Sequence, residues 1–258
     1  MRQDIKGFLL DLDGTLYTDN TVVSGAAESL DQLRRRGYSF RFVTNTTNKS
    51  RATLKKKIEG LGIPVSESEI FSAPFAAAQW LQKIPEARCW VLTRGDSSTD
   101  FEGLQLTDQD PNFIVLGDLM SGFTFELLND VFRKLLGGAE LVALQKNRYW
   151  LTEGELTIDA GAFVAALEYA SGKTAHLVGK PSCDFFNLAL ANIGLPASRV
   201  AMVGDDIEAD IEGAHGAGLK AILVKTGKFQ EEDVQKVGIP PDALIESIAD
   251  LPVLMGDS

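Results

Sequence analysis

The sequence predicts an α/β protein with a mainly parallel sheet, and two observations support this fold class. Short apolar runs alternate with segments of helical periodicity, which is typical of βαβ units. Glycines follow several of the helical segments, where left-handed C-terminal caps are expected. The 258 residues, 45% hydrophobic and 24% charged, suffice for a sizeable core in one large domain or two modest ones.

The elements are expected in a regular order along the chain. Strands are predicted at the short apolar runs 5–10, 39–43, 200–203 and 221–224. Helices are predicted at the periodic segments 26–36, 51–61, 183–193 and 207–217. The middle of the chain has its own strand and helix patterns at 89–93, 113–116, 125–136, 141–144 and 160–170. These are enough for a second α/β unit.

Charge and composition narrow the classes of partner and location. The formal net charge of −11 argues against nucleic acid or an anionic membrane as partner, since both require concentrated positive charge. No apolar run approaches the ~20 residues of a membrane span, and the first residues lack the layout of a signal peptide. Two cysteines do not make a disulfide framework, so we expect a reducing, cytoplasmic location.

Two carboxylates, Asp11 and Asp13, follow an apolar run directly and are followed in turn by Gly14-Thr15. If the strand breaks here, both acids stand at its C-terminal end, where open α/β folds bind ligands. Acids so close together repel each other, and a bound cation would remove that cost. The alternative is an Asx-type turn that merely closes the strand.

Two further stretches place polar groups after apolar runs. Thr44 and Asn45 follow a predicted strand and can donate hydrogen bonds to phosphate-like oxygens. Alternatively, Thr44 only ends the strand, and Asn48 or Ser50 caps the next helix. Lys180, between a strand and a helix, can neutralise phosphate charge or be a solvated surface residue.

A fourth stretch puts Asp205 and Asp206 directly after the predicted strand 200–203, with Asp210 one helical turn later. Acids near a helix N-terminus are favoured by the helix dipole, and this alternative accounts well for Asp206. It does not account for an acid cluster that abuts an apolar strand without a spacer.

The four stretches share one feature: each lies at the C-terminal end of a predicted strand. Together they supply carboxylates, a hydroxyl–amide pair and a lysine. Oxygen ligands of this kind suit Mg²⁺, which commonly takes one or two carboxylates plus substrate phosphate. A carboxylate freed from repulsion can act as a nucleophile in phosphoryl transfer. The pattern therefore favours a magnesium-dependent phosphoryl-transfer site.

With these motifs, the chain resembles the haloacid dehalogenase superfamily of phosphohydrolases. The stretches Asp-Leu-Asp-Gly-Thr, Thr44-Asn45, Lys180-Pro181 and Gly-Asp-Asp with a further Asp after three residues match its four motifs in order. The resemblance implies a Rossmann-like, doubly wound parallel-sheet core. The long stretch between the second and third motifs implies the branch (subfamily IIA) with an inserted, smaller α/β cap domain of C2 type. We expect core at 1–76 and 178–258 and cap at 77–177.

The resemblance also implies roles for the acids that lead the motifs. Asp11 would attack phosphorus and bind Mg²⁺. Asp13 would protonate the leaving group and then activate water, while its backbone carbonyl contacts the metal. Asp205 would be the third protein ligand of the metal. These roles describe a phosphatase that hydrolyses a small phosphorylated substrate through an aspartyl-phosphate.

The remaining motif residues would support this chemistry by the same resemblance. Thr44, Asn45 and Lys180 would hold the transferring phosphoryl group. Asp210, and Asp206 as a second candidate, would orient Lys180 or metal-bound water. This fits the physical demands of phosphoryl transfer, which needs mostly positioning and charge stabilisation.

Substrate choice in capped enzymes of this kind comes from the cap. The candidates by resemblance are Asn147, Arg148, Tyr149, Trp150 and the turn up to Asp159, with Arg94 and Asp96 as weaker ones. Arg148 could pair with an anionic substrate tail. Alternatively, Tyr149 and Trp150 pack the cap core. A homodimer through the cap is expected from the same resemblance.

Several alternatives stay open at this point. A dehalogenase or phosphonatase on the same fold is disfavoured by Asp13, since those branches usually lack aspartate there. A cysteine-based phosphatase is suggested by Cys89 and Arg94, but one residue too few separates them. A phosphate-binding protein without turnover could lose Asp11 or Asp13, and both are present. Protein phosphohistidine, pyrophosphate, a sugar phosphate and a nucleotide all remain as substrates.

Overall fold

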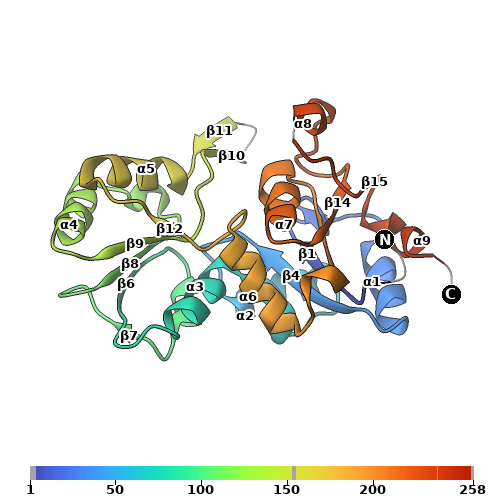
Figure 1. Ribbon diagram of the computed structural model, residues 1–258, viewed down its shortest axis with the longest axis horizontal. Helices are drawn as coiled ribbons and strands as arrows, with labels where there is room; N and C mark the ends of the chain where they lie inside the picture. The colour runs from blue at the N-terminus through green and yellow to red at the C-terminus, as the bar shows by residue number, and fades with distance from the viewer. Residues whose placement is uncertain (1–3, 153–154, 237, 257–258) are drawn as a thin grey trace. The chain divides into compact units, whose positions relative to one another are not determined.

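The computed structural model describes residues 4–152, 155–236 and 238–256, which form two compact units (Figure 1). The first unit holds the described residues up to Thr44, Leu54–Phe71 and those from Lys180 onward. The second holds Asn45–Thr53 and Ser72–Gly179. The domain limits 1–76, 77–177 and 178–258 stay a prediction.

The first unit is built on a six-stranded sheet with the order β15-β14-β13-β1-β4-β5. The strands are β1 (Gly7–Asp11), β4 (Ser39–Thr44), β5 (Ile70–Ser72), β13 (Val200–Gly204), β14 (Lys220–Val224) and β15 (Ala243–Ile245). The pairs of β1 with β4 and β13, of β13 with β14 and of β14 with β15 are parallel. The predicted parallel sheet is confirmed.

Helices cover both faces of this sheet, and its central strands β1 and β13 are buried along their whole length. All five residues of β1 are buried, as expected for a strand with two covered faces. Phe8 and Leu10 belong to the cluster that includes Leu30 of α1 (Ala26–Arg35) and Leu54 of α2 (Arg51–Gly60). On the opposite face, α6 (Cys183–Ile193) contacts β4 and α7 (Gly213–Gly216) contacts β14. The core is therefore doubly wound.

The strand order places a topological switch point beside β1. After β1 the chain continues to β4 on one side, and it later returns through β13 on the other side. Ligands of open α/β sheets bind outside the carboxyl ends of the strands at such a point. Asp11 ends β1, and Asp205 directly follows β13. The topology thus brings these two acids to one crevice.

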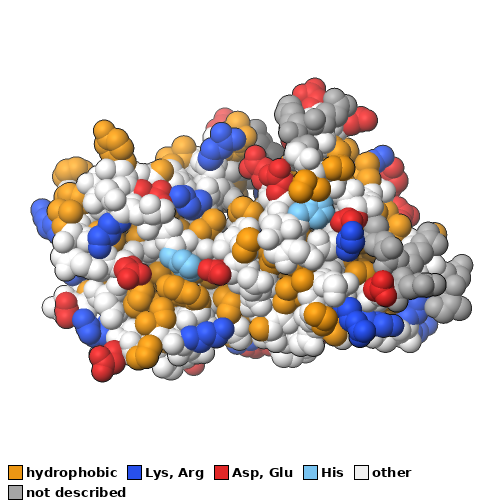
Figure 2. Space-filling view, viewed as in Figure 1, with side chains coloured by type: hydrophobic (Ala, Val, Ile, Leu, Met, Phe, Trp, Pro, Cys, Tyr) orange, Lys and Arg blue, Asp and Glu red, His pale blue; other side chains and the backbone are white. Residues whose placement is uncertain are grey.

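The second unit has its own parallel sheet, with the order β12-β9-β8-β6-β7. The strands are β6 (Arg88–Leu92), β7 (Gln105–Leu106), β8 (Phe113–Leu116), β9 (Glu140–Ala143) and β12 (His176–Leu177). Helices α4 (Phe125–Leu136) and α5 (Ala160–Ser171) pack together with β8 and β9 on one face. On the other face, Trp80 of α3 (Ala73–Leu81) packs edge-on against Phe113. Apolar side chains gather on the surface over α3 (Figure 2).

Smaller elements complete the described chain. Two antiparallel hairpins are β2 (Tyr17–Thr18) with β3 (Thr21–Val22), and β10 (Tyr149–Thr152) with β11 (Glu155–Ile158). Two short helices are α8 (Glu231–Lys236) and α9 (Leu251–Leu254). Single 3-10 turns lie at Glu67–Glu69, Ser97–Phe101, Met120–Gly122, Ala197–Arg199 and Ile248–Asp250. Within the described residues, every helix is too short or too polar to cross a bilayer.

One predicted helix differs in kind. The segment 207–217 begins as a π-helix, Ile207–Glu212, and only then becomes α7. The amide of Ile211 bonds to the carbonyl of Asp206, five residues before it. Asp206 caps this turn, while the carboxylate of Asp210 accepts a bond from the amide of Asp206. Such π-helical turns are frequent at functional sites, and here the turn folds Asp210 back toward the end of β13.

Candidate active site

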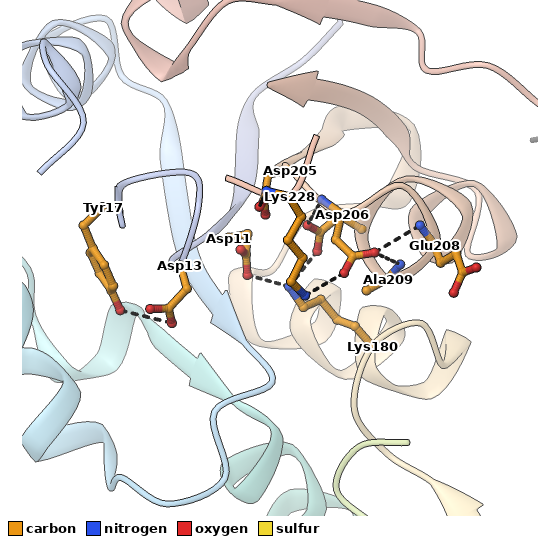
Figure 3. A network of polar contacts seen from close by, with 10 residues as sticks. Asp11, Asp13, Tyr17, Lys180, Asp205, Asp206, Glu208, Ala209 and Lys228 are labelled. Atoms are coloured by element: carbon orange, nitrogen blue, oxygen red, sulfur yellow. Dashed lines mark hydrogen bonds and ion pairs between the residues drawn. The ribbon is translucent and has the colours of Figure 1, made fainter. Parts of the chain in front are cut away.

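Lys180 lies buried between two carboxylates at the end of β1 (Figure 3). Its ammonium nitrogen is 2.5 Å from Oδ1 of Asp11 and 2.6 Å from Oδ1 of Asp210. The side chains of Lys180, Asp11 and Asp210 are only 4%, 9% and 0% exposed. An ammonium with three donors can serve both acids at once. Lys180 is thus a fixed positive charge, and its surface alternative is wrong.

Asp205 completes a group of buried acids around this lysine. One carboxylate oxygen from each of Asp11, Asp205 and Asp210 lies within 4.8 Å of the others. Oδ2 of Asp205 accepts a bond of 2.7 Å from the amide of Lys228, in the loop after β14. The predicted meeting of Asp11 and Asp205 at one point is therefore present in the structure.

Two glycines make room for Asp205. Gly14 and Gly227 have φ values of +87° and +65°, which favour glycine. A Cβ on either would lie 2.0 Å from Oδ2 of Asp205. The hydroxyl of Thr226 donates to the carbonyl of Gly14, so the two loops close around the carboxylate. A side chain at either glycine would displace Asp205.

The net negative charge of this buried group favours the binding of a cation. Three buried carboxylates face one buried ammonium, so full ionisation leaves two net negative charges in the crevice. Burial, followed by the charge of Asp210, raises the pKa of Asp205 to about 7. Burial also raises the pKa of Asp11 and of Asp210 above their usual range. Although burial alone would lower it, the pKa of Lys180 is raised by Asp11 and Asp210, so this lysine stays charged.

These residues fit a divalent metal ion. The donors are all carboxylate oxygens, as Mg²⁺ prefers, and a charge of two would neutralise the excess. Asp210 already uses Oδ1 for Lys180 and Oδ2 for the amide of Asp206, which makes it a support for Lys180. Asp11 and Asp205 are the side chains best placed to hold the ion.

Asp206 has a structural role that differs from those of Asp205 and Asp210. Its Oδ1 accepts bonds from the amides of Glu208 and Ala209, and so it caps the π-helical turn. Its Oδ2 lies 2.8 Å from the ammonium of Lys228, whose side chain is 66% exposed. Burial would raise the pKa of Asp206, but the charge of Lys228 holds it below its ordinary value. Asp206 thus fixes the backbone next to Asp205.

Asp13 lies apart from the buried group, and its side chain is 56% exposed. Its Oδ2 faces the hydroxyl of Tyr17 (Figure 3) at 3.5 Å. Its Oδ1 is 3.6 Å from the ammonium of Lys57. Burial and the charges of Asp13 and Asp11 raise the pKa of Tyr17 well above its usual value, so the phenol keeps its proton. A solvent-facing carboxyl beside a buried nucleophile candidate suits proton exchange with a substrate.

The phosphate-binding candidates divide between the units. Thr44 ends β4 and is 3% exposed. Its neighbour Val43 is in register with Asp11 on the adjacent strand, so Thr44 lies one residue beyond Asp11 along the sheet. Asn45 follows Thr44 directly and begins the second unit.

The cap candidates lie at the hairpin of the second unit. Arg148 precedes β10 and is exposed, with its guanidinium 5.7 Å from the ring centroid of Tyr149. Tyr149 is 53% exposed, and therefore it does not pack the core of this unit. Trp150 is half-buried and pairs with Thr157 across the hairpin. Their role in specificity stays a prediction.

The residues behind the cysteine alternative have structural roles. Cys89 is fully buried in β6, and burial raises the pKa of its thiol to about 11, so it lacks the thiolate that a nucleophile needs. Arg94 bonds to Asp118 at 2.7 Å. Asp96 accepts bonds from the amide and hydroxyl of Ser50 and from the hydroxyl of Thr53. These contacts hold the segment 45–53 within the second unit.

Four residues near the acids were not among the predicted site residues: Tyr17, Lys57, Gly227 and Lys228. Lys228 contacts Asp205 through its backbone amide, which carries no sequence signal. A stronger signal existed in the glycine between Thr226 and Lys228, directly after the apolar run at 221–224. Gly227 thus follows a predicted strand, as the four motif stretches do.

Comparison with known proteins agrees with this geometry. A family model described as "Haloacid dehalogenase-like hydrolase" matches residues 8–107, and one described as "HAD-hydrolase-like" matches residues 177–251. Human haloacid dehalogenase-like hydrolase domain-containing protein 2 is 40% identical over 94% of this chain and 93% of its own length. Human phospholysine phosphohistidine inorganic pyrophosphate phosphatase is 35% identical over 95% of this chain and 92% of its own.

Solved structures match the whole architecture. The p-nitrophenyl phosphatase from Archaeoglobus fulgidus has a TM-score of 0.91 at 27% identity, covering 97% of this chain and 99% of that one. A glycerol phosphate phosphatase from Mycobacterium tuberculosis, in complex with magnesium, has a TM-score of 0.86 at 27% identity, covering 96% and 77%. The chain belongs to the haloacid dehalogenase-like hydrolase family, as its four motifs indicated.

Proposed function

We propose that this hydrolase is a Mg²⁺-dependent phosphatase that acts on a small phosphorylated molecule through an aspartyl-phosphate on Asp11. One observation carries the proposal: Asp11, Asp205 and Asp210 meet around Lys180 in a buried group with an excess of negative charge. The names of the similar proteins, among them a p-nitrophenyl phosphatase and a magnesium-bound glycerol phosphate phosphatase, support the same conclusion.

The first step transfers the phosphoryl group to the protein. A carboxylate oxygen of Asp11 attacks phosphorus while the bond from phosphorus to the leaving oxygen breaks. Asp13 donates its proton to that oxygen, so the alcohol leaves neutral. Lys180, already fixed beside Asp11, would neutralise charge on the phosphoryl oxygens, with Thr44 and Asn45 as further donors.

The second step regenerates the carboxylate. A water molecule attacks phosphorus of the aspartyl-phosphate, and Asp13, now ionised, accepts a proton from this water. The bond from phosphorus to Asp11 breaks, and inorganic phosphate is released. When bound by Asp11, Asp205 and the backbone carbonyl of Asp13, Mg²⁺ would supply the positive charge that offsets repulsion between the carboxylates and the phosphate.

Trapping of the phosphorylated residue tests this proposal. Acid quench during turnover of p-nitrophenyl phosphate with Mg²⁺, followed by borohydride reduction, should convert Asp11 to homoserine, which mass spectrometry identifies. Asp11→Asn should lose turnover and the modified peptide together. Magnesium-dependent hydrolysis that persists in Asp11→Asn would contradict the nucleophile assignment. Asp108→Asn, at an exposed loop position, serves as a matched control.

The substrate class stays broader than any one name. A relative is named for phospholysine, phosphohistidine and pyrophosphate, and others for aryl or glycerol phosphates. A turnover screen over phosphorylated metabolites, pyrophosphate and phosphohistidine decides among these. Exposed Arg148 and Tyr149 in the second unit are the residues whose substitution should shift the ranking of substrates. A homodimer through this unit also stays a prediction.

A further inference from the structure

The proposed acid, Asp13, stands in a different environment from the other acids. Its side chain is 56% exposed, whereas those of Asp11 and Asp210 are at most 9% exposed. An exposed carboxyl turns freely, while an acid must meet the leaving oxygen within hydrogen-bond reach. Some part of the chain must therefore restrict Asp13 if it acts as proposed.

Two side chains contact the two oxygens of Asp13 separately. The hydroxyl of Tyr17 is 3.5 Å from Oδ2, and the ammonium of Lys57 is 3.6 Å from Oδ1. The same ammonium lies 3.9 Å from the centroid of the Tyr17 ring, within the range of a cation–π interaction. Tyr17, Lys57 and Asp13 thus form a closed triangle of contacts.

The supports are themselves rigid. The Tyr17 ring is fully buried, and the turn that carries it is held by bonds from the amide of Gly14 to the carbonyl of Tyr17 and from the amide of Leu16 to the carbonyl of Leu12. Lys57 projects from α2, and its side chain is only 21% exposed. The turn brings Tyr17 back beside Asp13, and the helix supplies the cation.

We propose that Lys57 and Tyr17 are positioning residues that aim Asp13 at the leaving oxygen. This inference rests on the proposed role of Asp13 as the acid. Each contact is longer than a strong hydrogen bond, so their contribution is orientation through two separate oxygens rather than strong binding. Lys57 also keeps one positive charge on the side of the site where the leaving group departs.

Substrates whose leaving groups differ in acidity test this inference. A leaving group such as p-nitrophenol departs without much help from an acid, whereas an alkyl alcohol needs its oxygen protonated. The measured quantity is kcat/KM, which covers the steps up to cleavage of the bond from phosphorus to oxygen. The substrates are p-nitrophenyl phosphate, phenyl phosphate and glycerol phosphate, each with saturating Mg²⁺.

The variants distinguish the effect of the Lys57 charge from that of the Tyr17 hydroxyl and from a loss of folded protein. Lys57→Gln removes the cation and Lys57→Arg restores it, while Tyr17→Phe removes only the hydroxyl. Lys56→Gln makes the same charge change at an exposed position of the same helix. Asp13→Asn gives the reference for complete loss of the acid. The activity on p-nitrophenyl phosphate shows in each case that the protein is folded.

We expect Lys57→Gln and Tyr17→Phe to lower kcat/KM for glycerol phosphate by about tenfold or more, a part of the ~10²–10⁴-fold that an acid contributes. For p-nitrophenyl phosphate we expect a much smaller loss, and Lys57→Arg should recover most of the activity on glycerol phosphate. Lys56→Gln should match the wild type on all substrates.

Equal losses on all three substrates would show a merely structural role and overturn the inference, provided that Asp13→Asn remains selective for the poor leaving groups. If Asp13→Asn also loses all substrates equally, the acid role of Asp13 fails, and the inference fails with it. The two failures are therefore distinguishable in one set of measurements.

Discussion

The close approach of Gly227 to Asp205 predicts the effect of adding one methyl group at this glycine. In Gly227→Ala, the new Cβ would lie 2.0 Å from Oδ2 of Asp205 and 2.6 Å from Cα of Gly14. Neither contact is tolerable, so the loop or the carboxylate must move. A left-handed alanine adds about 1–2 kcal/mol of its own.

The consequence for metal binding follows from the bond that must break. If the loop withdraws, Asp205 loses the hydrogen bond from the amide of Lys228, and a bond to a charged group contributes about 1.5–3 kcal/mol. Outer contacts of this kind typically change metal affinity by roughly 10- to 100-fold. We therefore expect the Mg²⁺ concentration for half-maximal activity to rise by that factor.

The assay is a Mg²⁺ titration of p-nitrophenyl phosphate turnover, paired with calorimetric titration of Mg²⁺. Gly37→Ala is the matched control, because Gly37 has φ +82° and its Cβ would meet nothing within 4 Å. It carries the same backbone strain without the clash. If Gly227→Ala binds Mg²⁺ as well as Gly37→Ala does, the loop does not position Asp205 and the reasoning is refuted.

Two further predictions concern stability. In EDTA, Asp205→Asn should raise the midpoint of thermal denaturation, since it removes one of three crowded carboxylates. Mg²⁺ at ~100 times its Kd should add about 2.7 kcal/mol to the free energy of unfolding of the wild type only. An equal stabilisation of the variant by Mg²⁺ would count against the metal site. Hydrogen bonds from Thr53 and Ser50 lower the pKa of Asp96 to about 2, so its stabilisation is complete above its unfolded pKa of about 4 and is lost as the pH falls through 2. Asp96→Asn should therefore lower the midpoint at pH 7, and this difference should shrink below pH ~4; a difference constant with pH would exclude this account.

The core could be predicted from sequence because its signals are local. The strands β1, β4, β13 and β14 begin and end within two residues of the predicted runs, since each is a continuous apolar segment closed by polar residues. The edge strands β5 and β15 have three residues each and are too short for a periodic signal. The π-helical turn depends on side-chain bonds of Asp206 and Asp210, which no periodicity encodes.

The site could be predicted to the extent that it follows strand ends. Asp11 and Asp205 meet because parallel neighbours β1 and β13 end at the same edge. The supports of these acids come from elsewhere: Lys57 projects from a helix, and Lys228 acts through its backbone. Such contacts depend on how elements pack, and a single sequence gives no pattern for them.

The buried acids around Lys180 carry more negative charge than this lysine can neutralise. A second buried lysine would halve the excess charge of the group of Asp11, Asp205 and Asp210, but it would compete with a divalent ion for the same oxygens. With Lys180 as the counter-charge, two negative charges remain when all three acids are ionised. Burial strengthens the repulsion between these charges because the local dielectric is low. Protonation of an acid relieves part of this repulsion, and a bound cation would relieve it without loss of charge, so the same charges that weaken the empty core would provide affinity for a metal. If the site binds Mg²⁺ as proposed, the stability of this unit and its Mg²⁺ affinity are coupled, and a substitution that relieves the repulsion should raise the stability while it lowers the affinity.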